Sequence, residues 1–144
     1  MTIVDDWVAF DTNIYIFGVR KNPKFPACVE LLERIGELHV HIPRQIIREL
    51  HNNLQPDEVH ELFSLFHRYH DRIRINWRTT SLELIEKFQQ LGCRLGDAAV
   101  AAHLEEEKIE TLISENRHFL SELPELPFRV LSSTAALEEL NRSN

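Results

Sequence analysis

The sequence predicts an α/β layer fold built on a mainly parallel sheet of five strands. Two observations lead to this prediction: short β-type runs alternate with segments of helical periodicity, and no repeat or linker-like tract interrupts the alternation. The β-type runs are rich in Val, Ile, Leu or aromatic residues and cover residues 7–10, 38–42, 73–77, 109–113 and 128–131. Because helical segments separate these runs, we expect the strands to lie parallel.

The segments between the expected strands carry the spacing of amphipathic helices. Apolar stripes at this spacing occupy residues 28–35, 46–54 and 59–69. The first stripe stops at Gly36, which suits a helix C-terminus, and the second follows Pro43, which suits a first turn. The letters TSLE at residues 80–83 match a capping box that opens a helix closing near Gly92. We therefore expect long helical insertions between the second and fourth strands.

The size and composition of the chain predict one domain. Its 144 residues are 43% hydrophobic and include four Gly and six Pro, which is enough to bury one substantial core and too little to favour two. We therefore expect a single domain over residues 1–144. No apolar run approaches the roughly 20 residues of a membrane-spanning helix, and residues 1–10 lack the pattern of a secretory signal. These features predict a cytoplasmic protein with no membrane partner.

The charge and the metal-ligating residue types exclude several classes of protein. A formal net charge of −7, from 16 Lys and Arg against 23 Asp and Glu, excludes coating of nucleic acid by bulk positive charge and leaves room for a local basic groove. Cys28 and Cys93 lack CxxC spacing, so we expect ordinary thiols and no zinc knuckle. His39 and His41 share one strand face, and we interpret them as solvated positions because a zinc site needs further ligands.

Polar side chains stand beyond two expected strands and early in two expected helices. Asp11 follows the first strand directly, and Ser114 and Asn116 follow the fourth. Glu49 flanks the apolar stripe of the helix after the second strand, and Asp97 is in line with a helix face that should pack on the sheet. In open parallel sheets, ligands bind beyond the carboxyl ends of the strands. We therefore expect these side chains to converge there.

Each acid also has a simple structural interpretation, which the sequence alone leaves open. Asp11 suits a helix N-cap, Asp97 suits a first helical turn, and Glu49 suits a solvated helical position. Together, however, three acids at one end of a sheet would repel one another, and their motifs contain no matching Lys or Arg. An oxygen-rich site of this kind suits Mg²⁺ or Mn²⁺, and Mg²⁺ is usually held by carboxylates together with substrate phosphates. The cluster therefore predicts a phosphoester substrate.

Four segments of the chain resemble, in order and spacing, the motifs of the PIN-domain ribonucleases. They are VAFDTNIYIF, IPRQIIREL, LGDAAVAAHL and LISENRHFL, and they are distributed over the entire chain. The resemblance implies a three-layer α/β/α sandwich and a Mg²⁺- or Mn²⁺-dependent endoribonuclease acting on RNA. Many relatives are VapC-type toxins of toxin and antitoxin pairs, so the resemblance also implies a small antitoxin protein and a homodimer as partners.

By this match, Asp11, Glu49 and Asp97 correspond to the metal-binding acids of the family, and with Asn116 they form the catalytic set. The fourth acidic position of the family falls on Asn116, which is a departure from the pattern. Asn keeps a carbonyl oxygen and loses the charge, so a second metal would bind weakly, or Asn116 would only orient a water. The expected reaction is hydrolysis of a phosphodiester by a metal-activated water that attacks in line.

Further polar residues near these motifs are expected to support the site. Asn13 and Ser114 match supporting positions beside the metal ligands, whereas Glu115 is expected to point elsewhere. The basic residues nearest the motifs in sequence are Arg44, Arg94 and Arg117, which are candidate RNA contacts, with Arg20, Lys21 and Lys24 on the loop after the opening motif. For each of them the alternative is an exposed side chain with no partner.

Three other functions compete with the nuclease. Receiver domains carry an acidic pair, but Asp5 and Asp6 precede the strand here, and haloacid-dehalogenase phosphatases need Asp-x-Asp where residue 13 is Asn. The strongest alternative is a PIN-like module that binds RNA or protein and has lost efficient catalysis. Asn116 and the acidic net charge favour that alternative, and the intact acids at the other three positions oppose it.

Overall fold

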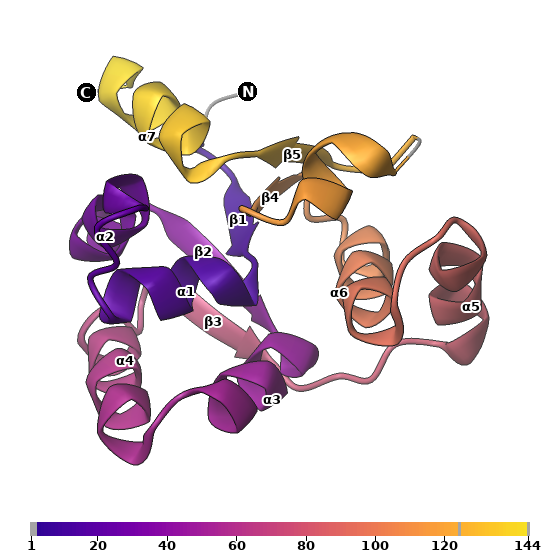
Figure 1. Cartoon of the computed structure of the whole chain (residues 1–144), viewed down its shortest axis with the longest axis horizontal. Helices are drawn as coiled ribbons and strands as arrows, with labels where there is room; N and C mark the ends of the chain where they lie inside the picture. The colour runs from indigo at the N-terminus through magenta and orange to yellow at the C-terminus, as the bar shows by residue number, and fades with distance from the viewer. Residues whose placement is uncertain (1–2, 124, 144) are drawn as a thin grey trace.

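The computed structural model describes residues 3–123 and 125–143 and shows a central sheet with helices on both of its faces (Figure 1). The strands are β1 (Trp7–Phe10), β2 (His39–Pro43), β3 (Ile73–Asn76), β4 (Thr111–Ile113) and β5 (Arg129–Leu131). They pair in the order β3-β2-β1-β4-β5, and every neighbouring pair is parallel. The parallel five-stranded sheet predicted from the sequence is confirmed.

The helices complete a three-layer α/β/α sandwich. Their bounds are α1 (Thr12–Val19), α2 (Pro26–Glu33), α3 (Arg44–Asn53), α4 (Pro56–Arg68), α5 (Leu82–Gln90), α6 (Leu95–Glu106) and α7 (Ser133–Arg142), with short turns η1 (Ile35–Glu37) and η2 (His118–Glu122). In Figure 1, α1, α2 and α4 lie on one side of the sheet and α5 and α6 on the other. Within the described ranges, no helix has the length and apolar character needed to cross a membrane.

The central strand shows why a run of consecutive apolar residues forms a strand here. β1 lies between β2 and β4, and its residues Val8, Ala9 and Phe10 are fully buried. A parallel strand covered by helices on both faces has no solvated side, so its sequence is continuously apolar. The register Ala9 to Leu112 and Phe10 to Ile113 brings the carboxyl ends of β1 and β4 to the same level.

Two local predictions differ from the structure. The capping box expected from Thr80 does not form, because Ser81 is the N-cap of α5 and its hydroxyl accepts a hydrogen bond from the Leu84 amide at 3.3 Å. A one-residue change in where a Ser or Thr begins a helix is within the usual uncertainty of helix ends. The prediction that His39 and His41 are solvated is wrong for His41, which is fully buried.

His41 is buried because its ring finds two partners. Its Nε2 lies 2.8 Å from Nε2 of His103 on α6, and its Nδ1 accepts a hydrogen bond from Nε of Arg74 at 2.8 Å. The pKa of His41 is lowered to about 4, mainly by burial and also by the neighbouring His103 and Arg74. His41 is therefore neutral near pH 7, and since Nδ1 accepts, its proton lies on Nε2 and is donated to His103.

Candidate functional site

The site lies where the strand order of the sheet reverses. From β1 the chain proceeds outward to β2 and β3, and it then returns past β1 to form β4 and β5 on the other side. The two strands that flank this reversal are joined beyond their ends, because the amide of Asp11 donates to the carbonyl of Ile113 at 2.8 Å. A crevice outside the carboxyl ends of parallel strands at such a reversal is where open α/β sheets bind ligands.

Asp11 is the N-cap of α1 and is almost fully buried, with 5% of its surface exposed. Its Oδ1 accepts from the amide of Thr12 at 2.9 Å, and its Oδ2 accepts from the hydroxyl of Ser114 at 2.7 Å. The pKa of Asp11 is raised to about 6, mainly by burial and also by the nearby charges of Asp97 and Glu49, while the hydrogen bonds from Ser114 and Thr12 oppose the shift. Asp11 therefore both caps a helix and belongs to an acidic cluster.

Glu49 is held near Asp11 by two neutral hydrogen-bond donors. The hydroxyl of Thr12 donates to Oε1 at 2.7 Å, and Nε2 of Gln45 donates to Oε2 at 2.9 Å. Gln45 lies one turn before Glu49 on α3, so the helix itself positions this pair. Thr12 and Gln45 were not predicted as site residues, and only the Thr following Asp11 offered a local signal for this role.

Asp97 is in the first turn of α6, as predicted, and its partner is Asn116. The amide Nδ2 of Asn116 lies 3.3 Å from Oδ2 of Asp97, and the backbone amide of Asn116 donates to the Ser114 hydroxyl at 2.9 Å. The side-chain oxygen of Asn116 accepts from the amide of His118 at 3.0 Å. Hydrogen bonds thus run from Asp11 through Ser114 and Asn116 to Asp97.

The remaining polar residues of the loop after β4 act on backbone and helix ends. Oδ1 of Asn13 accepts from the amide of Glu115 at 3.4 Å, which ties this loop to α1. Oε1 of Glu115 accepts from the amide of Ser133 at 2.9 Å and also from the Ser133 hydroxyl. Glu115 therefore points toward the start of α7 and away from the acids, as expected.

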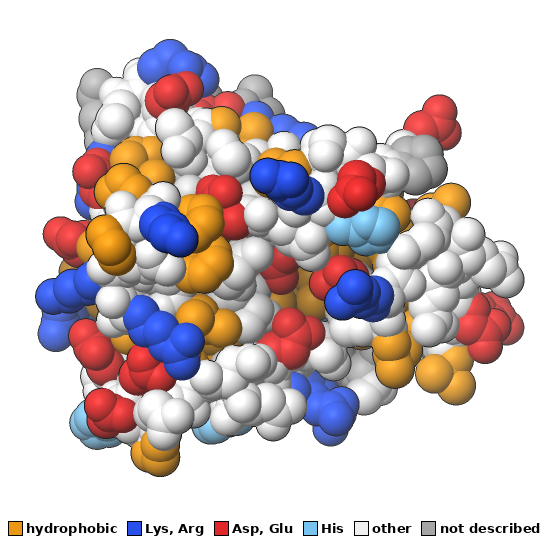
Figure 2. All heavy atoms as spheres, in the orientation of Figure 1, with side chains coloured by type: hydrophobic (Ala, Val, Ile, Leu, Met, Phe, Trp, Pro, Cys, Tyr) orange, Lys and Arg blue, Asp and Glu red, His pale blue; other side chains and the backbone are white. Residues whose placement is uncertain are grey.

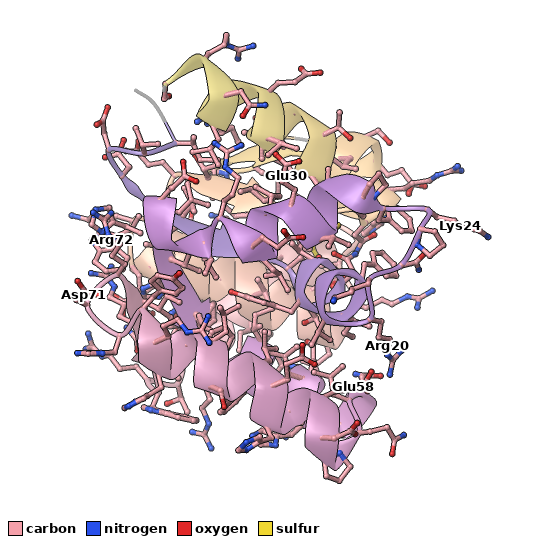
Figure 3. The ribbon with its side chains drawn as sticks, turned by 90° about the vertical axis from the view of Figure 1, so that its left-hand side faces the viewer. Arg20, Lys24, Glu30, Glu58, Asp71 and Arg72 are labelled. Atoms are coloured by element: carbon pink, nitrogen blue, oxygen red, sulfur yellow. The ribbon has the colours of Figure 1, made fainter. Side chains whose placement is uncertain are left out.

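Figure 2 shows acidic side chains near the centre of the face in view, in the region between α1, α3 and α6 of Figure 1, with basic side chains around them. Arg44, Arg94 and Arg117 are exposed, and in the described part of the chain no carboxylate lies within ion-pair distance of them. Arg20, in contrast, is bound to Glu58 at 2.9 Å, and Figure 3 shows these two side chains facing each other while Lys24 extends outward. Arg20 is therefore not free to contact a ligand at the acids.

The residues present fit a divalent cation by charge and by ligand type. Asp11, Glu49 and Asp97 offer only oxygen atoms, and no Lys or Arg among the described residues lies within ion-pair distance of them. In the described part of the chain, no three His, Cys, Asp or Glu side chains are already arranged to hold a metal ion. This arrangement suits Mg²⁺, which keeps several waters and is commonly held by one or two carboxylates, better than a cation enclosed by protein ligands alone.

Comparison with known proteins identifies the fold. Neither a known protein family nor a curated protein matches the sequence. Among solved structures, VapBC2 from Rickettsia felis bound to a DNA fragment from their promoter is similar with a TM-score of 0.58 and 20% identity, over 88% of this chain and 98% of that chain. PAE2754 from Pyrobaculum aerophilum is similar with a TM-score of 0.58 and 13% identity, over 95% of this chain and 97% of that chain. The chain shares the fold of these two structures, and the PIN-like fold that the resemblance implies is confirmed.

Proposed function

We propose that this protein is a metal-dependent endoribonuclease. The observation that carries the proposal is the convergence of Asp11, Glu49 and Asp97, with no cationic partner among the described residues, at the point where the sheet order reverses. Without a ligand, these like charges repel one another and destabilise the folded protein, so the cluster is best explained by a positively charged ligand. The PIN-like fold supports the same function.

The three acids would hold Mg²⁺ or Mn²⁺, and Asn116 would position Asp97 through its amide. A bound ion of this kind supplies a Lewis acid that activates water and counters the charge developing on phosphoryl oxygens. Thr12 and Gln45 fix both oxygens of Glu49, and Ser114 fixes Asp11, so the carboxylates are oriented before a ligand binds. No Ser or Cys nucleophile is required for hydrolysis by this route.

The bordering arginines would orient the RNA strand. Arg94 is the N-cap of α6, immediately before the turn that carries Asp97, and Arg117 follows Asn116. Arg44 begins α3, the helix that carries Glu49. These three guanidinium groups can bind phosphates on either side of the scissile bond without competition from a protein carboxylate. By family resemblance the products would carry a 5′-phosphate and a 3′-hydroxyl.

The test is cleavage of a 5′-labelled single-stranded RNA by the purified protein in Mg²⁺ or Mn²⁺, with an EDTA reaction beside it. We expect cleavage in either metal, none in EDTA, and a loss of at least about a hundredfold in Asp97→Asn, because this change removes one charge of the cluster. Glu106→Gln, an exposed position near the other end of α6, is the matched control and should cleave as the wild type does.

The alternative function is a PIN-like module that binds RNA or protein without efficient catalysis, and Asn116 favours it. The same experiment separates the two functions. If wild-type protein and Asp97→Asn release products at the same rate, or if EDTA leaves the rate unchanged, the nuclease proposal fails and the binding module is preferred.

We further propose that this protein is the toxin of a type II toxin and antitoxin pair. It would act in the cytoplasm as a homodimer, with a small antitoxin protein as its partner. The similarity to VapBC2 supports a second protein as a partner. A small gene that abuts or overlaps the gene for this chain, whose product binds the chain on coexpression, would support the pair. Absence of such a gene would favour a nuclease that acts alone, and light scattering of the purified chain would measure its oligomeric state.

A further inference from the structure

Two adjoining hollows lie beside the acidic cluster, on either side of the first turns of α3. The first, about 240 Å³ in volume, is lined by residues that include Gln45, Arg78 and Thr79. The second, about 630 Å³, is lined by residues that include His51 and Trp77. Both are also lined by the same two arginines of α3, Arg44 and Arg48. We call the combined surface of Arg44, Arg48, Trp77 and Arg78 the arginine groove.

The arginine groove is continuous with the candidate site through one side chain. Gln45 lines the first hollow and also donates to Oε2 of Glu49 at 2.9 Å. From the opposite wall, α6 contributes Ala99 to the same hollow, two residues beyond Asp97. A polymer bound at the acids would therefore enter the groove without crossing an intervening element.

The charges in the arginine groove are available to a ligand. Arg44 and Arg48 are exposed one turn apart on α3, and no carboxylate in the described ranges lies within ion-pair distance of either. Arg78 has one ion pair, with Glu107 at 3.7 Å, and 76% of the Arg78 side chain is exposed. Such an exposed pair is weak and screened, so a phosphate can compete for this guanidinium. On a chain of net charge −7, this local concentration of positive charge favours an anionic partner.

The groove also contains an exposed indole on a structured loop. Trp77 is 58% exposed, and within the described residues no ring stacks on it and no cation lies over it. The loop that carries Trp77 is fixed by the side chain of Asn76. Oδ1 of Asn76 accepts from the backbone amide of Arg78 at 3.0 Å, and Nδ2 of Asn76 donates to Oε1 of Glu107 at 2.7 Å. A large aromatic surface held open beside guanidinium groups is the combination that binds an unpaired base and its phosphates.

We propose that the arginine groove binds single-stranded RNA that continues from the scissile phosphate, with one base stacked on Trp77 and phosphates on Arg44, Arg48 and Arg78. The proposal rests on the proposed function, because it extends the path of the same substrate. Bases in a duplex are already stacked on their neighbours, so Trp77 selects an unpaired strand. The groove thereby gives the nuclease a preference for single-stranded over double-stranded substrate.

The test measures binding in EDTA, where hydrolysis does not occur, by the fluorescence anisotropy of a labelled single-stranded RNA of about 12 nucleotides. We expect Trp77→Ala to weaken binding about tenfold, because one base–aromatic stack is lost, and Trp77→Phe to retain most of the affinity. Arg48→Gln should weaken binding and reduce the salt dependence by about 0.7 in the slope of log K against log salt, since one phosphate contact is lost.

Arg68→Gln is the matched control, because Arg68 is an exposed arginine at the end of α4, beside a different hollow between α1, α2 and α4. It should bind RNA as the wild type does. A duplex RNA and a single-stranded DNA of the same sequence are included, and loss of Trp77 should reduce the preference for the single strand over the duplex. Crosslinking of wild-type protein to 4-thiouridine RNA, with the crosslinked peptide identified, tests the groove without any substitution.

The outcomes separate the groove from the catalytic proposal. If the Trp77 and Arg48 variants lose affinity in EDTA while wild-type protein cuts no RNA in Mn²⁺, the groove is supported and the nuclease proposal fails. If the wild type cuts RNA while these variants bind as Arg68→Gln does and crosslinks fall outside the groove, the groove proposal is overturned and the nuclease stands. Failure of the wild type to bind single-stranded RNA overturns the groove proposal as well.

Discussion

At the scale of single residues, Asp11 determines how the site responds to pH. Burial raises the pKa of Asp11 from 3.8 to about 6, so this carboxyl binds its proton more tightly in the folded chain than in the unfolded chain. Between the unfolded pKa of 3.8 and the folded pKa of about 6, the folded state carries more protons than the unfolded state, so the free energy of unfolding falls as the pH rises. Ionisation of Asp11 therefore costs about 3 kcal/mol of stability at neutral pH, from roughly 1.4 kcal/mol for each pKa unit.

Asp11→Asn should remove this cost, because Asn is neutral and remains a good N-cap. We expect the variant to be more stable than the wild type at about pH 8 by up to about 3 kcal/mol, and to differ little from it near pH 4, where Asp11 is protonated. Urea unfolding of both proteins in EDTA at the two pH values measures this. Equal stability at about pH 8, or a variant that is less stable there, would contradict the raised pKa.

The residue scale also shows what a sequence reveals of a site. That the three acids lie near one another could be predicted, because Asp11 directly follows a strand, Asp97 is in the first turn of a helix, and Glu49 flanks the apolar stripe of α3. Their partners were harder to predict, since Gln45 is an ordinary polar position of an amphipathic helix until Glu49 is seen to accept from it. His41 was wrongly placed in solvent because its partner His103 is 62 positions away and shares no local pattern with it.

At the scale of elements, α6 approaches α3 closely beside the Glu49 side chain. Gly96 is in the first turn of α6, and a Cβ at this position would lie 3.2 Å from Oε2 of Glu49 and 3.5 Å from Nε2 of Gln45. The strands and most of the helices were predictable from the sequence pattern, and the strand bounds shift by at most two residues, but α7 (Ser133–Arg142) was not predicted. Contacts between helices far apart in sequence, such as this one, have no local signal.

Gly96→Ala should therefore act on the site and not on the fold. The methyl group displaces the Glu49 carboxylate by a few tenths of an ångström, and we expect RNA cleavage to fall about tenfold. Stability should be unchanged or slightly higher, because Ala favours a helix over Gly by up to about 1 kcal/mol. Cleavage rates and melting temperatures of the variant, compared with Glu106→Gln on the same helix, check both expectations. A large drop in melting temperature without loss of activity would contradict this role for Gly96.

At the scale of the whole molecule, the topology assembles the candidate site from segments distributed over most of the chain. Asp11 follows β1, Glu49 is in α3, Asp97 is in the first turn of α6 and Asn116 follows β4, and the order of the strands brings these positions to the same edge of the sheet. The alternation of elements predicted a parallel sheet. The strand order was not available from periodicity, which records what each segment buries and not which segment lies beside it.

The central claim is that Asp11, Glu49 and Asp97 form one divalent-cation site. The most direct measurement is calorimetric titration of Mn²⁺ into metal-free wild-type protein, Asp97→Asn and Glu106→Gln at neutral pH. We predict saturable binding to the wild type, the same affinity for Glu106→Gln, and an affinity at least about tenfold weaker for Asp97→Asn. Absence of saturable binding to the wild type, or equal affinity in all three proteins, would contradict the claim.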